Sequence, residues 1–454
     1  MEQSERKAKE REKQRKKQER AARREMRRYR RAFAFFRFVL KPFLRRKFGY
    51  RCDDLSRIEG PYLLLANHNT EFDPMLVGLA TKKQLFFVAS EHIMRKGFGT
   101  WFLTRYFRPI IHRKGKDGAK SVFSILKTLR SGSSVALFAE GNRSFDGVTG
   151  PIAEATGKMA KVAGVPVVTF RFEGGFLTQP RFSTDVRKGR MYGRLVHVYS
   201  REELAAMSEE DVNKAIAADL HEDAYEAQKR ERITYKGKKK KLAYGLESTL
   251  CRCIRCGEFG TLRSDRDTIR CDRCGMTAVY DVFGELTVTD GSPEMSGQFG
   301  TIGSGTDPAG QNAEMPGNGS PAGAAPLVTN LRDWVAEQRK ALAARIREAA
   351  QDEVLFSDSV TVREIDENHK FAGEREATLL AYRDRVCIAG GEHTEKLRDL
   401  AVYSRNFITA YCEARGPEGG ARWKQYDIRG DERFNALKYY DLMRESEAPA
   451  NDTH

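Results

Sequence analysis

The sequence predicts an α/β domain, then a small cysteine-rich ribbon, then a C-terminal α+β module. Between residues 49 and 235, short apolar runs alternate with helical patterns, which is typical of a sheet that carries helices on its faces. Five cysteines crowd into residues 251–274. Residues 289–328 are rich in Gly, Ser and Pro, and such a composition buries too little apolar surface to offset its ordering entropy. We therefore predict that they form a flexible linker between two folded parts of the chain.

Composition limits the classes of partner. The chain has 454 residues, 79 Lys and Arg against 63 Asp and Glu, and a formal net charge of +16. Long-range electrostatics therefore favour polyanions, namely nucleic acid, anionic lipid or phosphorylated substrates. The eight cysteines are spread too unevenly for a disulfide framework. No apolar run approaches the roughly 18 residues of a spanning helix, and the N-terminus is too polar for a secretory signal, so we expect the chain in a reducing cytoplasm.

Two segments are predicted at the N-terminus. Residues 1–32 are a basic arm with 15 Lys or Arg and 6 Glu. In residues 33–48, Phe side chains are interleaved with cations, as in an amphipathic membrane-interface segment whose rings enter the acyl boundary while its cations meet lipid phosphates. A solvated helix and a nucleic-acid-binding tail are the alternatives for the arm. The adjacent aromatic segment favours peripheral attachment to an anionic membrane surface, on the cytoplasmic face of the cell membrane, over nucleic acid.

The short apolar runs of the α/β domain, residues 49–235, predict buried strands. Continuous apolar runs of this length suit strands that are covered on both faces. Helical patterns predict helices over residues 119–129 and 154–163. The predicted strands are Tyr62–Ala66, Leu85–Ala89, Val135–Phe138, Val165–Phe172 and Leu195–Tyr199.

His68 and Asp73 are candidate catalytic residues. His68 closely follows the apolar run Tyr62–Ala66, so its imidazole is expected at the C-terminal end of a strand, where open α/β sheets place their sites. Asp73-Pro74 predict a helix start with Asp73 as N-cap, and the five-residue offset lets Asp73 fold back onto the ring. A carboxylate on one ring nitrogen leaves the other to take a proton from a hydroxyl. Taken alone, the same residues also fit a helix cap and a surface histidine.

A second strand end carries groups suited to an anion. The run Val135–Phe138 is followed closely by Glu140, Gly141, Asn142, Arg143 and Ser144. Glycine allows close approach of the backbone, arginine offers a bidentate fork for phosphate, and serine adds a donor. A third strand end contributes Arg113, although a cation at such a position is often simply solvated.

The order of these blocks along the chain resembles the glycerolipid acyltransferase family, whose type members acylate 1-acylglycerol-3-phosphate in bacteria. That family has His-x4-Asp, an Arg-bearing strand, Phe-Pro-Glu-Gly-x-Arg-Ser and Val-Pro-Val in this order, and the resemblance covers about residues 51–199. It implies a mixed sheet flanked by helices, with His68 and Asp73 as the catalytic dyad. One departure is Ala139, where the family usually has proline. The implied acceptor-phosphate site comprises Arg113, Glu140, Gly141, Asn142, Arg143 and Ser144.

The resemblance also implies direct acyl transfer. His68 would deprotonate the acceptor hydroxyl, which would attack the thioester of acyl-CoA or acyl carrier protein. The chain has no Gly-x-Ser-x-Gly elbow, in keeping with a reaction that needs no acyl-enzyme. The acceptor expected first is lysophosphatidic acid, and another lysophospholipid or glycerol 3-phosphate would suit the same dyad. A candidate lining for an acyl-chain tunnel is formed by Val165, Pro166 and Val167.

Four cysteines predict a metal site. They form two Cys-x2-Cys pairs, each followed by glycine, and two such knuckles make a tetrahedral thiolate site that fits Zn²⁺. We predict a structural zinc ribbon over residues 246–288, because four thiolates leave the ion no open position for catalysis. Free cysteines and an iron cluster are alternatives, and Cys251 is a spare ligand beside the first pair. The predicted ligands are Cys253, Cys256, Cys271 and Cys274.

Zinc ribbons also bind nucleic acid. The ribbon therefore favours, more than any other part of the chain, an alternative from a different class: a membrane or nucleic-acid adaptor on an inactive acyltransferase-like scaffold. The presence of both His68 and Asp73 argues against that alternative.

Residues 329–446 are predicted to form an α+β module whose function the sequence leaves open. Strand-like runs are found at residues 360–362, 379–388, 400–402, 407–411 and 423–428, and a last helix is predicted over residues 434–443. The first helix of the module is predicted from the helical spacing of Leu331, Trp334, Val335, Gln338, Leu342 and Ile346.

Overall fold

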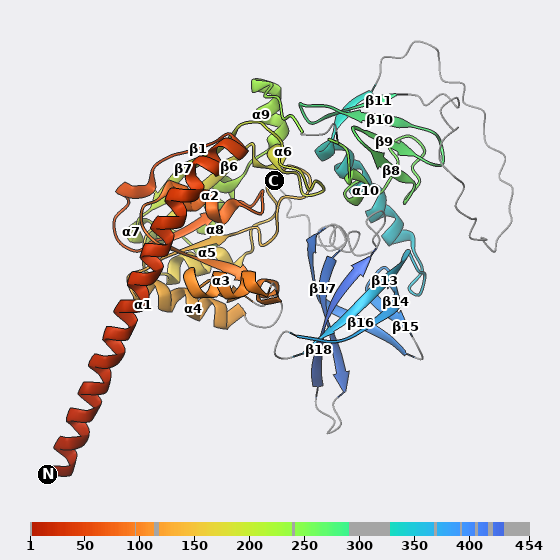
Figure 1. The fold of residues 1–454 in the computed structure, drawn as a ribbon. Helices are drawn as coiled ribbons and strands as arrows, with labels where there is room; N and C mark the ends of the chain where they lie inside the picture. Colours follow the sequence, from red (N-terminus) through yellow and green to blue (C-terminus); the bar gives the residue numbers. More distant parts are fainter. Residues whose placement is uncertain are drawn as a thin grey trace.

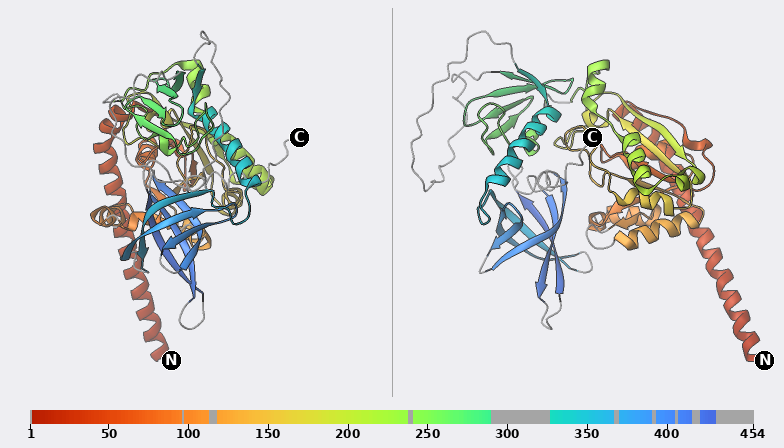
Figure 2. Two further views of the ribbon diagram at one scale, coloured as in Figure 1. Left: turned by 90° about the vertical axis from the view of Figure 1, so that its right-hand side faces the viewer. Right: turned by 180° about the vertical axis from the view of Figure 1, so that it is seen from behind.

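The computed structural model contains an α/β domain, a β-ribbon and a β-barrel (Figure 1). A long helix joins the ribbon to the barrel, as two further views also show (Figure 2). The structure describes residues 2–95, 97–112, 118–237, 241–289, 327–366, 370–390, 393–404, 407–415 and 421–430.

A seven-stranded mixed sheet forms the α/β domain, as predicted. Its strand order is β1-β7-β6-β2-β5-β3-β4. β2, β3, β4, β5 and β6 run parallel, whereas β7 is antiparallel to β6 and parallel to β1. The strands are β1 (Tyr50–Cys52), β2 (Leu63–Ala66), β3 (Leu85–Ser90), β4 (Ile110–His112), β5 (Ser134–Phe138), β6 (Val167–Glu173) and β7 (Met191–Tyr199).

Helices cover both faces of this sheet. Side chains of β2 alternate between two apolar clusters, since Leu63 and Leu65 pack with α4, α5 and α8, whereas Leu64 and Ala66 pack with α1 and α2. This alternation is what a strand buried on both faces requires. The helices are α1 (Glu2–Phe48), α2 (Asp73–Ala80), α3 (Phe98–Tyr106), α4 (Gly118–Arg130), α5 (Ala155–Val162), α6 (Gly175–Thr178), α7 (Arg201–Ala206), α8 (Glu209–Leu220) and α9 (Ala224–Glu231).

The helix α1 is continuous through the predicted arm and the predicted membrane-interface segment. Its C-terminal part is anchored in the domain, because Leu44 and Phe48 are buried beside β1 and α2. Its N-terminal part projects away from the rest of the chain (Figure 1), and residues 12–23 are exposed. A helix that is polar on all sides, as this part is, has no apolar face to pack against a domain.

The ribbon is a five-stranded antiparallel sheet in the order β12-β11-β10-β9-β8. Its edge strand β12 lies beyond residues 290–326 and was not predicted. β12 leads directly into α10 (Leu331–Glu348), where all six residues that predicted a helix are buried. The strands are β8 (Leu262–Asp265), β9 (Thr268–Cys271), β10 (Thr277–Tyr280), β11 (Glu285–Thr289) and β12 (Leu327–Asn330).

After α10 comes a closed antiparallel barrel of six strands, so the C-terminal module is β-rich. The predicted run at residues 379–388 is divided between two strands, because Tyr382 N donates to Arg385 O in a tight turn. The predicted helix at residues 434–443 lies outside the described residues. The strands are β13 (Phe356–Ile365), β14 (Phe371–Ala381), β15 (Val386–Gly390), β16 (His393–Ser404), β17 (Phe407–Arg415) and β18 (Ala421–Gly430).

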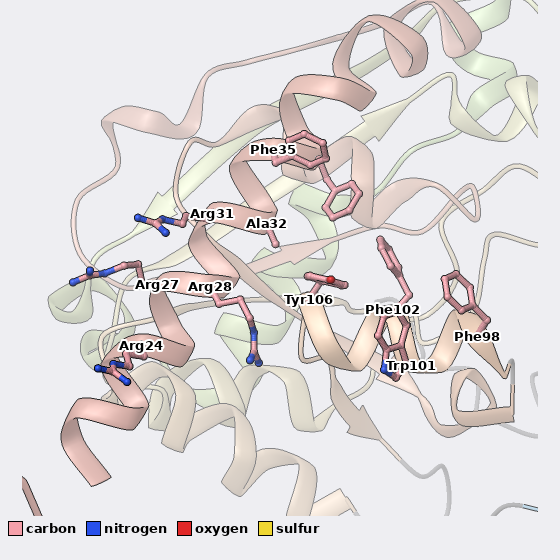
Figure 3. A pocket seen from close by; sticks show the side chains of 11 residues that line it. Arg24, Arg27, Arg28, Arg31, Ala32, Phe35, Phe98, Trp101, Phe102 and Tyr106 are labelled. Atoms are coloured by element: carbon pink, nitrogen blue, oxygen red, sulfur yellow. The ribbon is translucent and has the colours of Figure 1, made fainter. Parts of the chain in front are cut away.

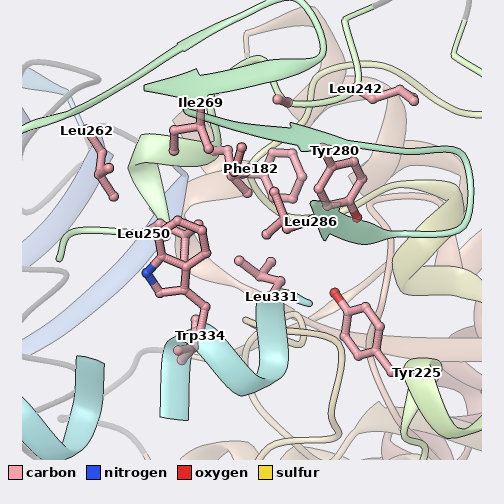
Figure 4. Close-up of a cluster of buried hydrophobic side chains, with 14 of the residues drawn as sticks. Phe182, Tyr225, Leu242, Leu250, Leu262, Ile269, Tyr280, Leu286, Leu331 and Trp334 are labelled. Carbon is pink, nitrogen blue, oxygen red and sulfur yellow. The ribbon is translucent and has the colours of Figure 1, made fainter. Parts of the chain in front are cut away.

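The ribbon and the α/β domain share one apolar core. Phe182 and Tyr225 of the α/β domain pack with Ile269 of the ribbon and Trp334 of α10 (Figure 4). At the edge of this core, Arg332 Nη1 lies 2.5 Å from Asp223 Oδ2. The two units are therefore joined by buried apolar contact and not only by the chain.

Candidate active site and metal centre

The candidate site lies where two neighbouring parallel strands end. β2 and β5 are paired from Leu63 with Val135 to Ala66 with Phe138, so the loops that follow them emerge at the same edge of the sheet. These loops are bonded to each other, because Ser144 N donates to His68 O at 2.7 Å. The structure thus brings the His68 block and the Arg143 block together.

Asp73 is fully buried and accepts four hydrogen bonds. Its Oδ2 lies 2.8 Å from His68 Nδ1 and accepts from Asn69 N at 2.6 Å and Thr70 N at 2.9 Å. Its Oδ1 accepts from Thr70 Oγ1 at 2.6 Å. These donors suit an ionised carboxylate, which then favours the tautomer of His68 that carries its proton on Nδ1.

The start of α2 differs by one residue from the prediction. Phe72 is the N-cap, Asp73 is the first helical residue, and Pro74 follows it. The Asp73 carboxylate still accepts from backbone N–H groups, but these belong to the loop before the helix and not to the first turn.

His68 is reachable from outside, since its side chain is 22% exposed. Its ring stacks on Phe138 with 4.5 Å between ring centroids and 24° between planes. Stacking on one face and the Asp73 hydrogen bond fix the plane of the imidazole. The Nε2 atom is then the ring nitrogen left to exchange a proton with a ligand.

Glu140 holds the two loops together from inside. Its Oε1 accepts from His68 N at 2.5 Å, and its Oε2 accepts from Gly150 N at 2.8 Å and Ser144 Oγ at 3.1 Å. Burial raises the pKa of Glu140 to about 7. Both Glu140 oxygens are thus occupied by protein donors, and Ser144 is buried between Glu140 and Asn69.

Arg143 brings a buried guanidinium with spare donor capacity. Its Nη1 is buried and has no hydrogen-bond partner among the described residues, while its Nη2 lies 3.8 Å from Glu71 Oε1. Burial lowers the pKa of Arg143. A buried donor without a partner costs stability, and a bound anion would satisfy it. Gly141, with φ +70°, makes the turn before Arg143, and Asn142 lies between them, partly exposed.

The predicted tunnel segment is not brought to the dyad. Arg113 lies outside the described residues. Val165 and Val167 are buried in the core, and Val167 pairs with Leu63, at the start of β2. His68 follows the other end of that strand, about 16 Å away at roughly 3.3 Å per residue. The predicted acyl-chain tunnel at Val165, Pro166 and Val167 therefore has no support, because the segment lies at the amino end of its strand and forms part of the core.

Sequence reasoning missed Glu222, which supports the same loop from the opposite side. Its Oε2 accepts from Asn69 Nδ2 at 2.7 Å and its Oε1 accepts from Gly174 N at 2.5 Å. Burial raises the pKa of Glu222 to about 8. Glu222 reaches the site because Val148 forms an isolated bridge with Asp223. No local sequence signal marks this contact, which joins residues about 150 positions apart.

The region around the dyad is similar to known proteins. Residues 47–173 match the family model described as Acyltransferase. This region is an acyltransferase-family domain. A similar relative is the 1-acyl-sn-glycerol-3-phosphate acyltransferase of Streptococcus pneumoniae, which is 29% identical over 119 residues. That match covers 26% of this chain and 45% of the relative, so it spans less than half of the relative's length.

Among solved structures, the acyltransferase domain is similar to PlsC, the 1-acyl-sn-glycerophosphate (LPA) acyltransferase of Thermotoga maritima. The two are 18% identical, and the alignment covers 40% of this chain and 77% of that chain with a TM-score of 0.33.

The four predicted cysteines converge at one point of the ribbon. Cys253 Sγ lies 3.7 Å from Cys274 Sγ, and Cys256 Sγ lies 3.8 Å from Cys271 Sγ. All four sulfur atoms lie within 4.8 Å of one another. Four thiolates at such distances can hold a metal ion in a tetrahedral arrangement.

Both cysteine pairs have the same turn. Gly257 N donates to Cys253 O and Gly275 N donates to Cys271 O, each at 3.0 Å. The two glycines have φ of +76° and +71°, a conformation that glycine adopts at no steric cost. Cys251 lies outside the cluster, and its Sγ lies 3.2 Å from Gln338 Oε1.

Among the helices that the structure describes, none has the length and apolar composition needed to cross a membrane.

The raised pKa of Glu222 predicts a pH-dependent stability. Between the ordinary glutamate value of 4.5 and about 8, the folded chain keeps a proton on Glu222 that the unfolded chain releases. The free energy of unfolding should therefore fall as pH rises through this interval. Glu222→Gln cannot ionise, so its free energy of unfolding should fall less. Urea unfolding at several pH values between about 5 and 8 measures both slopes.

A matched control is Glu154→Gln, because Glu154 is exposed and its side chain makes no cap hydrogen bond with α5. This control should keep the pH dependence of the wild type. Parallel slopes for wild type and Glu222→Gln would contradict the prediction.

Proposed function

We propose that this chain transfers a fatty acyl group from acyl-CoA or acyl carrier protein to the free hydroxyl of 1-acylglycerol-3-phosphate, which makes phosphatidic acid. The observation that carries the proposal is the His68–Asp73 pair, with 2.8 Å between Nδ1 and Oδ2, together with the buried Nη1 of Arg143, for which no described residue is a hydrogen-bond partner. The family model and the name of the Streptococcus pneumoniae relative support the reaction class.

In this proposal His68 is the general base. Its Nε2 takes the proton of the acceptor hydroxyl, and the oxygen attacks the carbonyl carbon of the thioester. The tetrahedral intermediate then expels the thiolate, which takes the proton back from the imidazolium. Asp73 stabilises that imidazolium and keeps the ring in the reactive tautomer.

The acceptor is held by its phosphate. Arg143 is the proposed phosphate ligand, because its Nη1 is a buried donor without a partner in the part of the chain that the structure describes. Glu140 and Ser144 position the loop, since a carboxylate repels phosphate and both side chains are bonded within the protein. Another lysophospholipid or glycerol 3-phosphate carries a similar phosphate, and only the name of the relative favours 1-acylglycerol-3-phosphate.

The four-cysteine cluster holds a structural Zn²⁺ in our proposal. Cys253, Cys256, Cys271 and Cys274 would supply all four ligands, so no coordination position remains for substrate. The ion would stabilise the ribbon and, through the shared apolar core, the contact with the acyltransferase domain.

We further propose that α1 attaches the chain peripherally to an anionic membrane, at its cytoplasmic face. Its exposed aromatic residues include Phe38, which is 79% exposed, and Phe43. Arg45 and Arg46 lie exposed beside them. Exposed rings next to cations are the composition that interfacial helices use.

Replacing the general base should abolish most of the activity. His68→Ala should lower the rate of thiol release from acyl-CoA with lysophosphatidic acid by about 10² to 10⁴-fold, because that range is typical for the loss of a positioned general base. A thiol-reactive dye follows the reaction directly.

The control is His197→Ala. His197 also faces a carboxylate, Glu203, at 3.3 Å, but both side chains are exposed on the surface. This variant should keep the wild-type rate. Equal rates for wild type and His68→Ala would exclude His68 as the base.

Removing the charge of Arg143 should weaken the use of phosphorylated acceptors. Arg143→Gln should lower kcat/KM for lysophosphatidic acid about 10- to 100-fold, the equivalent of one charged hydrogen bond of about 1.5–3 kcal/mol. Any residual rate with a monoacylglycerol, which lacks the phosphate, should not fall. Equal losses for both acceptors would assign Arg143 a structural role instead.

Loss of one metal ligand should destabilise the ribbon. Cys271→Ser should reduce the zinc content of the purified chain and lower its thermal midpoint, since structural zinc contributes folding free energy. Cys251→Ser should keep its zinc, because Cys251 lies outside the cluster. Elemental analysis with thermal unfolding makes the comparison. A wild type purified without bound metal, or full zinc in Cys271→Ser, would refute the assignment.

A further inference from the structure

A groove of about 820 Å³ lies between α1 and α3. Tyr29 and Phe33 hold α1 against the domain, because Tyr29 packs edge-on against Phe86 of β3 and Phe33 is buried near α2. α3 connects β3 with β4, which lie two and three strands away from β2 at one edge of the sheet. The residues that line the groove include neither His68 nor Asp73.

One end of the groove is cationic. Arg24, Arg27, Arg28 and Arg31 line it, and their spacing of three and four residues puts them on one face of α1. Among the described residues, no ion pair involves Arg24, Arg27 or Arg31. Arg28 contacts Glu25 and Tyr29, and no described residue is a hydrogen-bond partner of its buried Nε. Of the ion pairs in the described part of the chain, the one with Glu25 is therefore the one that these four guanidinium groups make.

The other end of the groove is aromatic. Phe35 and Phe36 continue the lining along α1, and Phe98, Trp101 and Phe102 face them from α3 (Figure 3). Phe98 is 77% exposed and Trp101 is 52% exposed. Exposing rings of this size to water is costly in a soluble protein, so the aromatic end is suited to meet hydrocarbon.

The two ends are segregated along α1. From Arg28 to Phe38 the helix axis rises about 15 Å, which is half of the roughly 30 Å hydrocarbon core of a bilayer. Beyond the groove, the exposed residues Phe38, Val39 and Phe43 alternate with cations, of which Arg45 and Arg46 are exposed. The segregation of arginines from rings is therefore a property of the groove itself.

We infer that this groove binds an anionic phospholipid of the membrane, with the lipid phosphate on the arginines and the lipid hydrocarbon on the aromatic side chains. The inference depends on the proposed function in one respect, namely that the chain acts at a membrane surface. It adds α3 as a second membrane contact and gives the attachment a preference for anionic headgroups.

Single-stranded nucleic acid is the competing ligand, because it also uses cations and aromatic rings. A nucleic-acid groove distributes its cations along the whole backbone and stacks bases between them. Within the groove, the four arginines lie at one end, and the other end is lined by rings without a further cation, namely Phe35, Phe36, Phe98, Trp101, Phe102 and Tyr106. This segregation favours an amphiphile.

Vesicle binding by the full chain, without acyl donor, tests the inference. Arg27→Gln/Arg31→Gln should bind vesicles of equal parts phosphatidylglycerol and phosphatidylcholine about 10- to 30-fold more weakly than wild type, since each cation near an anionic surface contributes about 1 kcal/mol. Arg23→Gln/Arg30→Gln removes the same charge from exposed positions of α1 outside the groove lining. This control should change the affinity less than about threefold.

Tryptophan fluorescence tests whether the lipid lies in the groove. Trp101 should be quenched by phosphatidylglycerol that carries brominated acyl chains, whereas Trp334 is buried in the shared core and should not respond. The change should disappear in Trp101→Phe. Equal losses for the two arginine pairs, no quenching of Trp101, or displacement of vesicles by a single-stranded oligonucleotide would each overturn the inference.

Thiol release with a detergent-dispersed acceptor separates this inference from the proposed function. If turnover depends on His68 but vesicle binding does not depend on Arg27 and Arg31, the lipid-binding inference is refuted and the proposed function is not. If vesicle binding depends on Arg27 and Arg31 but the chain shows no turnover, the lipid-binding inference stands and the proposed acyl transfer is refuted.

Discussion

The candidate site depends on the burial of one carboxylate. Asp73 has no exposed surface and accepts hydrogen bonds from two backbone N–H groups and one hydroxyl in addition to its contact with His68. An ionised group in such a place is stable only because every oxygen is satisfied. The same hydrogen bonds leave Asp73 a single orientation. Because Asp73 contacts the imidazole, the loop that precedes α2 also fixes the orientation of the ring. Backbone geometry, and not the pair of side chains alone, therefore sets the direction in which His68 Nε2 points.

A second layer of carboxylates keeps that loop in register with its neighbours. Glu140 bonds the loop after β2 to the loop after β5, and Glu222 bonds Asn69 to the loop after β6. Asn69 and Ser144 complete the connection, since Ser144 Oγ lies 3.0 Å from Asn69 Oδ1. Three neighbouring strand ends are joined by buried polar groups that leave His68 and Arg143 for ligands. Networks of this kind are rigid when fully satisfied.

Local signals were sufficient for the five longer strands of the α/β domain, β2, β3, β5, β6 and β7, and for the meeting of the His68 and Arg143 blocks. The apolar runs at β2, β5 and β6 are long enough to be recognised, and adjacent parallel strands bring His68 and Arg143 to one edge. β1 and β4 have three residues each, too few for a pattern. Barrel closure depends on β13 pairing with β18, more than 60 residues later in the chain, and no short-range pattern encodes such a pairing.

The parts of the site that the sequence did not place have physical reasons as well. The Val165–Val167 segment was assigned to a tunnel because its composition is apolar, but composition does not say which end of a strand faces the dyad. Glu222 was missed because its partner Asn69 is distant in sequence. The role of Glu140 depends on which atoms donate to it, and a motif of residue types does not contain that information.

The ribbon and the acyltransferase domain share one apolar core. Because of this core, the segment that holds the candidate site and the segment that folds as a unit end at different residues. The candidate site ends near Glu222 in the sequence, yet Phe182 and Tyr225 are covered by side chains from the ribbon and from α10. A chain cut after residue 235 would keep His68, Asp73 and Arg143 and expose these rings to water, with the tendency to aggregate that such surfaces bring. The segment that holds the candidate site is therefore smaller than the unit that folds.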